Sequence, residues 1–137
     1  MNTPSSRTAS VPPPPLVIDT RDYDRLRALA ERALDTAPDV AQYLLDEVDR
    51  ADVMPPELMP GSVVRIGSLV TYQDAASGSI RTVRLVLPPD ADLAAMRVSV
   101  ISPIGAALIG LREGQSIAWQ LRDGLDRVLT VTRVLND

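Results

Sequence analysis

The first third of the chain carries apolar residues at helical spacing, in two separate stretches. Between residues 20 and 35 they recur every three or four positions, which predicts a helix that buries one face. Asp19 or Thr20 precedes this pattern as a favourable N-cap. Asp22 and Asp24 fall in the first turn, where the helix dipole favours negative charge. The apolar positions are Tyr23, Leu26, Ala30, Ala33 and Leu34.

A second helix is predicted from about Asp39 to Ala51, after a break at residues 36–38. Its apolar side carries Val40, Leu44, Leu45 and Val48. Because the connection is short, we expect the two helices to pack as an antiparallel helical hairpin, a short coiled coil. Each helix has about 13–16 residues and is therefore roughly 20–24 Å long, at about 1.5 Å per residue.

Proline-rich segments lie on both sides of this predicted hairpin, which we assign to residues 16–52. Residues 1–15 are rich in Ser, Thr and Pro and end in four prolines. We expect them to form a flexible or polyproline-type leader that buries no apolar surface. Residues 53–61 hold three prolines and a glycine, and we expect a linker there.

From residue 62 the pattern changes to that of β-strands. Runs of strand-forming residues over 63–72 and 80–87, separated by a turn, predict a hairpin. A strand at 98–101 and a second hairpin, 116–121 with 127–135 across Asp123-Gly124, follow. Between them, Ser102 and Pro103 suit the N-cap and first position of a short helix that ends at Gly110. We expect residues 62–137 to form about five antiparallel strands wrapped on one helix, which makes the chain α+β.

Composition narrows the classes of function. The chain has no Cys and no His, and so lacks the usual zinc ligands and the thiol and imidazole groups of many catalytic sites. Its glycines are scattered, with no phosphate-binding loop. With no Phe, one Trp and three Tyr, it offers few faces on which bases could stack. We expect no enzymatic activity, no cofactor, no metal and no direct binding of nucleic acid.

The predicted location follows from two patterns that the chain lacks. No apolar run approaches the roughly 20 residues that cross a bilayer, and residues 1–15 lack the pattern of a secretory signal. We therefore expect a cytoplasmic protein that does not bind membranes. A monomer is the simplest expectation for its assembly, although exposed apolar positions such as Tyr23 or Tyr43 could also pair the hairpins of two chains.

Charge is unevenly divided along the chain. Residues 19–52 hold ten acidic and five basic side chains, a net charge of −5. Residues 61–137 hold seven acidic and eight basic side chains, a net charge of +1. The acidic helices are either simply solvated or complementary to a basic surface on a partner.

Two small groups of residues are candidates for a functional site. Ser102 has neither a His nor a Lys in the chain to activate it as a nucleophile, and an N-cap role accounts for it. Asp35 and Asp39 flank the connection between the predicted helices. A pair of carboxylates can hold Mg²⁺, usually with ligands from a substrate or partner. Acidic residues at positions 46, 49 and 52 are weaker candidates, because such pairs are common on helices.

The order of these parts resembles that of the bacterial Gre transcript-cleavage factors. The stretch GSLVTYQDAASGSIRTVRLVLP is similar to the opening hairpin of the Gre C-terminal domain, and ISPIGAALIGLREGQSIAW to its most characteristic segment. LVIDTRDYDRLRAL and LLDEVDRADVMPPELMPGSVV resemble a branch with a truncated hairpin. That branch is the regulator of nucleoside diphosphate kinase family, and the similarity covers residues 16–135.

The resemblance implies an FKBP-like C-terminal domain that binds RNA polymerase near the mouth of its secondary channel. Ser102, Pro103 and Gly105 would then lie at the docking surface, although capping and tight packing also account for them. Gre factors place tip carboxylates at the polymerase active site, where they help to hold Mg²⁺. Asp35 and Asp39 occupy the tip here, but a hairpin of roughly 22 Å looks too short to cross the channel. We therefore expect a regulator that competes with Gre factors without stimulating transcript cleavage.

Two other functions stay open at this point. The family name indicates an effect on nucleoside diphosphate kinase, either direct or through its expression, and no residue pattern suggests a direct contact. An FKBP-like fold would also suit a prolyl isomerase. Such enzymes use an aromatic pocket, however, and the C-terminal domain offers only Tyr72 and Trp119 for one.

Overall fold

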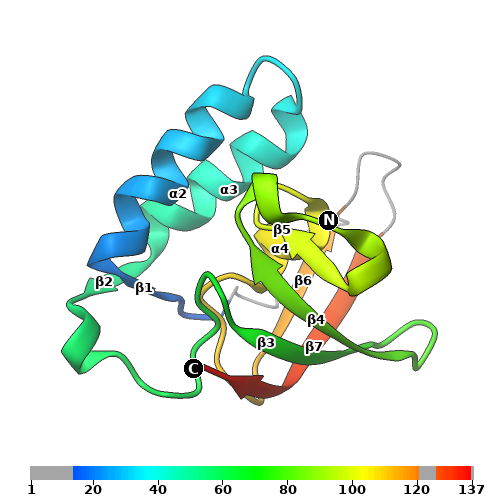
Figure 1. Cartoon of the computed structure of the whole chain (residues 1–137). Coiled ribbons are helices and arrows are strands. Elements are labelled where there is room, and N and C mark those ends of the chain that lie inside the picture. The colour runs from blue at the N-terminus through cyan, green and yellow to red at the C-terminus, as the bar shows by residue number, and fades with distance from the viewer. Residues whose placement is uncertain (1–13, 121–125, 137) are drawn as a thin grey trace, which may run out of the picture.

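The computed structural model describes residues 14–120 and 126–136. Two helices, α2 (Thr20–Ala33) and α3 (Pro38–Arg50), lie beside a five-stranded sheet, and the short helix α4 (Pro103–Leu108) lies between α3 and that sheet (Figure 1). The mixed α+β class is as predicted. Among the helices in this part of the chain, none has the length and apolar character that crossing a membrane requires.

The helices α2 and α3 begin and end close to the predicted boundaries. Asp19 is the N-cap of α2, and its side chain accepts a hydrogen bond from the backbone N of Arg21 at 2.8 Å. On the predicted apolar faces, Leu26 of α2 and Leu44 of α3 are buried, whereas Leu34, just after α2, is exposed. An ion pair of 2.5 Å between Arg27 and Asp49 links the two helices directly. They therefore pack side by side, joined by the connection at residues 34–37.

Two short parallel strands lie where the helical segment begins and ends. β1 (Val17–Asp19) pairs with β2 (Asp52–Met54), with Val17 opposite Asp52. The two helices are nearly equal in length, 14 and 13 residues, so the end of α3 lies beside the start of α2 and β2 can pair with β1. β2 and the 3₁₀ turn η1 (Pro56–Leu58) occupy the predicted linker, so residues 53–61 contain regular structure. The division of the chain into domains stays a prediction.

The main sheet has the strand order β5-β4-β3-β7-β6. Its middle strands pair antiparallel, as predicted: β4 with β3, β3 with β7, and β7 with β6. The turn predicted at residues 123–124 between β6 and β7 lies outside the described residues, as does the leader up to residue 13. The strands are β3 (Leu69–Asp74), β4 (Ile80–Val86), β5 (Arg97–Ser99), β6 (Ser116–Gln120) and β7 (Asp126–Leu135).

The prediction of a wholly antiparallel sheet is wrong at one edge, where β5 runs parallel to β4 with Arg97 opposite Arg84. Residues 87–96 do not make a tight hairpin turn. They include two 3₁₀ turns, η2 (Pro88–Asp90) and η3 (Leu93–Ala95), which return the chain to the level of Arg84, so that β5 pairs with the last three residues of β4. Two adjacent prolines at 88 and 89 favour this longer connection, because proline cannot donate a backbone hydrogen bond across a hairpin.

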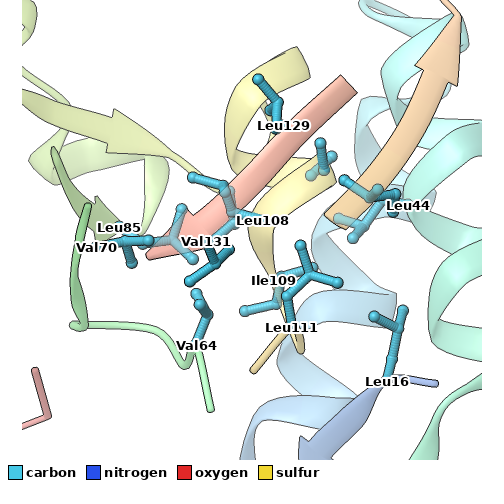
Figure 2. Close-up of a cluster of buried hydrophobic side chains, with 14 of the residues drawn as sticks. Leu16, Leu44, Val64, Val70, Leu85, Leu108, Ile109, Leu111, Leu129 and Val131 are labelled. Atoms are coloured by element: carbon cyan, nitrogen blue, oxygen red, sulfur yellow. The ribbon is translucent and has the colours of Figure 1, made fainter. Parts of the chain in front are cut away.

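One cluster of buried apolar side chains joins the helices to the sheet. Leu44 of α3 lies in the same cluster as Leu108 of α4, Leu85 of β4 and Val131 of β7 (Figure 2). Leu16, just before β1, is also part of it. The helical segment and the sheet therefore share a core, with α4 and the residues after it between them.

A close approach after α4 holds β1 in place. Gly110 has a φ of +82°, a conformation that glycine adopts without strain. Its carbonyl accepts a hydrogen bond from the backbone N of Val17 at 3.1 Å, and its own N donates to Val64 O at 3.0 Å. A Cβ at this position would lie 3.2 Å from Leu16 Cβ. Gly110 thus connects β1 to the segment that leads into the sheet.

Candidate functional site

The turn that leads into α4 is held by the hydroxyl of Ser102. Ser102 Oγ accepts a hydrogen bond from the backbone N of Gly105 at 3.0 Å, which makes it the N-cap of α4. The same Oγ donates to the carbonyl of Ser99 at 2.7 Å. The backbone N of Ser102 also donates to that carbonyl, at 3.0 Å. The hydroxyl is therefore engaged in the structure of the turn, both as donor and as acceptor.

Gly105 is buried in the first turn of α4 and packs directly on the backbone of residues 99–100. A Cβ at this position would lie 2.0 Å from Ser99 O and 2.8 Å from Ser99 C. Real Cβ atoms do not approach so closely, so any other residue would push α4 away from the end of β5. Gly105 therefore shapes the candidate surface without presenting a side chain on it.

Pro103 and Ile104 border a hollow of about 430 Å³. Pro103 is exposed and Ile104 is half-buried. The opposite sides of the hollow come from the β3–β4 hairpin and from β7. We call this the Pro103 hollow; its other lining residues are Tyr72, Asp74, Ser77, Ser79, Arg81, Arg127 and Leu129.

Two arginines give the Pro103 hollow a cationic side. Arg81 is exposed, whereas Arg127 is half-buried. The Nε of Arg127 is buried and has no hydrogen-bond partner among the described residues. Burial raises the pKa of Tyr72, the charge of Arg81 opposes this rise, and that of Asp74 adds to it. The hollow thus combines an apolar edge at Pro103 and Ile104 with two guanidinium groups.

The predicted tip residues lie on a different element, the connection between α2 and α3. Asp35 and Asp39 are both exposed, and Asp39 is in the first turn of α3. Backbone hydrogen bonds from residues 36 and 37 to Ala33 O close the connection. Figure 1 shows it at the end of the helices opposite β1 and β2. Within residues 14–120 and 126–136, no three His, Cys, Asp or Glu side chains gather closely enough to hold a metal ion.

Another polar cluster, at Asp19, joins α2 to the segment before β3. Asp19 is 1% exposed and accepts hydrogen bonds from Arg21 Nη2 at 3.2 Å and from Arg65 Nη2 at 2.5 Å. Burial alone would raise the pKa of Asp19. The hydrogen bonds from Arg21 and the charges of Arg21 and Arg65 outweigh burial, so the pKa is lowered. The N-cap role was predictable from sequence, but no local pattern connects residues 19 and 65.

The structure brings Ser102, Pro103 and Gly105 together in a single turn, and adds Arg81 and Arg127, which sequence reasoning did not select. Neither arginine stands in a motif. Arg127 is one strand residue in a run of alternating positions, and its buried Nε depends on how β7 meets the β3–β4 hairpin. The sequence could have singled out Arg127 only if the position of β7 beside the β3–β4 hairpin had been known.

Comparison with known proteins assigns both parts of the chain. Residues 59–136 match the family described as "Transcription elongation factor, GreA/GreB, C-term", and residues 14–54 match the family described as "Rnk N-terminus". The "Regulator of nucleoside diphosphate kinase" of Escherichia coli strain K12 is 36% identical over 118 residues. The similarity covers 86% of this chain and 87% of that relative.

The elongation factors are similar over a shorter stretch of sequence. "Transcription elongation factor GreA" of Rhodospirillum rubrum is 43% identical over 74 residues, which are 54% of this chain and 47% of that protein. A solved structure described as "Prokaryotic transcription elongation factor GreA/GreB from Nitrosomonas europaea" superposes with a TM-score of 0.70 at 31% identity. It covers 90% of this chain and 99% of that one, so the likeness extends over the helices as well as the sheet.

Proposed function

Because the chain belongs to the regulator of nucleoside diphosphate kinase family and carries the C-terminal domain of the GreA/GreB elongation factors, we propose that it binds bacterial RNA polymerase. It does so at the mouth of the secondary channel, where it modulates transcription and competes with Gre factors without stimulating transcript cleavage. The observation that carries the proposal is the GreA/GreB match over residues 59–136, which contains the whole Ser102–Gly105 turn. The proposal includes an FKBP-like fold for this domain.

The docking surface that we propose is the rim of the Pro103 hollow. Pro103 is exposed and offers a rigid apolar contact beside the half-buried Ile104. The guanidinium groups of Arg81 and Arg127 line the same hollow and would face a carboxylate or carbonyl oxygen of the polymerase. Ser102 and Gly105 act indirectly, by fixing the turn that presents Pro103.

The short helices support the non-catalytic part of the proposal. α2 has 14 residues and is therefore about 21 Å long, and the tip carboxylates follow it, with Asp35 in the connection and Asp39 in the first turn of α3. The tip would remain in the outer part of the channel and would not reach the polymerase active site. Both carboxylates are exposed and would contribute to the negative charge with which the helices face a basic surface there.

A displacement experiment tests the docking surface. Fluorescently labelled protein is titrated with core RNA polymerase, and unlabelled Gre factor is then added to displace it. Replacing Pro103 by Ala is expected to weaken binding at least about fivefold, a cost above about 1 kcal/mol that is typical of a central contact. Pro88→Ala is the matched control, because Pro88 is also exposed and also begins a short helical turn.

Two results would contradict this docking surface: equal weakening by the two proline replacements, or binding that Gre factor does not displace. Equal weakening would place the contact elsewhere on the chain, and binding that Gre factor does not displace would place it at a different site on polymerase.

A second candidate function rests on one observation, the 36% identity with a protein named for nucleoside diphosphate kinase, over most of both chains. The activity of purified kinase, measured with and without this protein, tests a direct effect. A change in kinase activity with no polymerase present, together with a complex isolated by gel filtration, would support this candidate. An unchanged activity and no complex would eliminate direct action.

A further inference from the structure

Four arginines line a second hollow, of about 740 Å³, at the junction between α2 and the sheet. Arg21 and Arg25 come from the first turns of α2, whereas Arg65 and Arg84 come from the segment before β3 and from β4. Ile66, Gly67 and Asn136 complete the lining together with Asp22. This arginine hollow shares no lining residue with the Pro103 hollow.

Positive charge is concentrated here in an otherwise acidic protein. The lining holds four arginines and one aspartate, and Asp19 lies against Arg21 and Arg65. The charge of Glu57 also acts on Arg21, so among the described residues four positive and three negative groups give a local net charge of +1, although the whole chain carries −4. The hollow therefore favours an anion over a cation.

Ion pairs with Asp19 and Asp22 orient three of these arginines and leave most of their guanidinium N–H groups available for a ligand. Arg25 Nη2 donates to Asp22 at 2.5 Å, Arg21 Nη2 to Asp19 at 3.2 Å, and Arg65 Nη2 to Asp19 at 2.5 Å. Each guanidinium has five N–H donors, and within the described residues the side chains of these three arginines use one nitrogen each. Their side chains are 51%, 67% and 26% exposed, respectively, so the other donors are accessible from the hollow.

We propose that the arginine hollow binds a small anion through a pyrophosphate group, either free pyrophosphate or the diphosphate of a nucleotide. The planar guanidinium forms paired hydrogen bonds with phosphate oxygens, and several guanidinium groups facing a single hollow suit two linked phosphates. A volume of about 740 Å³ lies within the range of small-molecule sites, roughly 300–1,000 Å³. The arginines surround a concavity, whereas a nucleic-acid backbone would require cations in a row along a groove.

The lining also determines how selective the site is. It contains no aromatic side chain, and its only large apolar residue is Ile66. A nucleotide base would therefore find no face on which to stack, and recognition rests on the phosphates. Because two of the arginines belong to α2 and two to the sheet side, a bound diphosphate would also hold these two parts of the molecule together.

Calorimetric titration of the full chain at fixed ionic strength tests the site, with pyrophosphate, ADP, GDP and inorganic phosphate as probes. Pyrophosphate, ADP and GDP are expected to bind with similar affinities, and inorganic phosphate more weakly. Adding pyrophosphate should change the NMR chemical shifts of the backbone amides of residues 21–25 and 65–67. The double variant Arg21→Gln/Arg25→Gln, which changes two exposed side chains, should lower the affinity at least about tenfold.

The matched control is Arg32→Gln/Arg97→Gln, which removes the same charge from exposed positions outside the hollow. It should bind pyrophosphate within about twofold of the unaltered chain, since exposed distant charges are largely screened. The proposal is wrong if pyrophosphate does not bind saturably, or if both double variants lose affinity equally. It is also wrong if a glutamate-rich peptide saturates the hollow while pyrophosphate does not, because the hollow would then dock an acidic protein segment. None of these results depends on binding to polymerase.

Discussion

At the residue scale, the candidate docking surface depends on a few backbone contacts around Ser99. Its carbonyl accepts hydrogen bonds from both the N and the Oγ of Ser102, and it lies against the Cα of Gly105. The sequence predicted Ser102 as an N-cap and Pro103 as the first helical residue, because capping is local chemistry. It could not predict that Gly105 packs on residue 99, since that contact depends on how α4 folds back on β5.

Replacing Gly105 by Ala is expected to lower the free energy of unfolding by about 3 kcal/mol or more. The added methyl group would lie 2.0 Å from a backbone oxygen, so α4 or the end of β5 has to shift. Gly61→Ala is the control, because a Cβ there meets nothing within 4 Å, and its effect should stay within about 0.5 kcal/mol. Urea unfolding followed by circular dichroism measures both. Equal stability of the two variants would disprove the close packing of α4.

Asp19 gives a prediction about pH. Its folded pKa is lowered below the ordinary value of 3.8, so the unfolded chain binds more protons in the window between the two values. The stabilisation from its ionised form is therefore fully present above about pH 4 and is lost as the pH falls through the folded pKa. Asp19→Asn retains an acceptor for the helix cap but removes the charge that faces Arg65.

Urea unfolding of the unaltered chain and of Asp19→Asn, measured from pH 7 to pH 2, checks this prediction. We expect the variant to be less stable by about 1–3 kcal/mol at pH 7, since it weakens a largely buried charged hydrogen bond. The difference should shrink below about pH 4. A difference that stays constant to pH 2 would show that the charge of Asp19 does not stabilise the fold.

At the scale of elements, strong periodic patterns predicted the structure well and long-range pairings were missed. The two helices and the strands β4, β6 and β7 lie within a few residues of the predicted ranges, because their apolar spacing is local information. The strand predicted over 63–72 is correct only in its second half, since β3 begins at Leu69. β1 and β2 are three residues each and pair only because α2 and α3 return the chain to its starting level. The parallel pairing of β5 depends on the course of residues 87–96, which sequence spacing does not determine.

Leu44 tests whether α3 is part of the core. It is completely buried in the cluster shared with α4 and the sheet, so Leu44→Ala should cost about 2–5 kcal/mol. Leu58→Ala, at a position 66% exposed, should cost less than about 0.5 kcal/mol. Denaturant unfolding of both variants gives the comparison. A small cost at Leu44 would mean that the helices pack only loosely on the rest of the protein.

At the scale of the whole molecule, the continuous core couples the helices to the sheet. The sequence indicated a hairpin, a linker and a separate sheet domain, because prolines at 55, 56 and 60 are typical of a boundary. In the structure, Gly110, Asp19 and Arg65 connect β1 and α2 to the sheet side. The helices would therefore be presented to a partner in one orientation, close to the turn that carries Pro103.

The most direct test of the proposed function is RNA cleavage in a backtracked elongation complex that contains a Gre factor and is titrated with this protein. We expect cleavage to fall as the protein is added, excess Gre factor to restore it, and this protein alone to stimulate none. Robust cleavage with this protein alone would contradict its non-catalytic role. Unchanged Gre-stimulated cleavage at saturating protein would contradict a shared site on polymerase, and an effect on nucleoside diphosphate kinase would become the leading explanation.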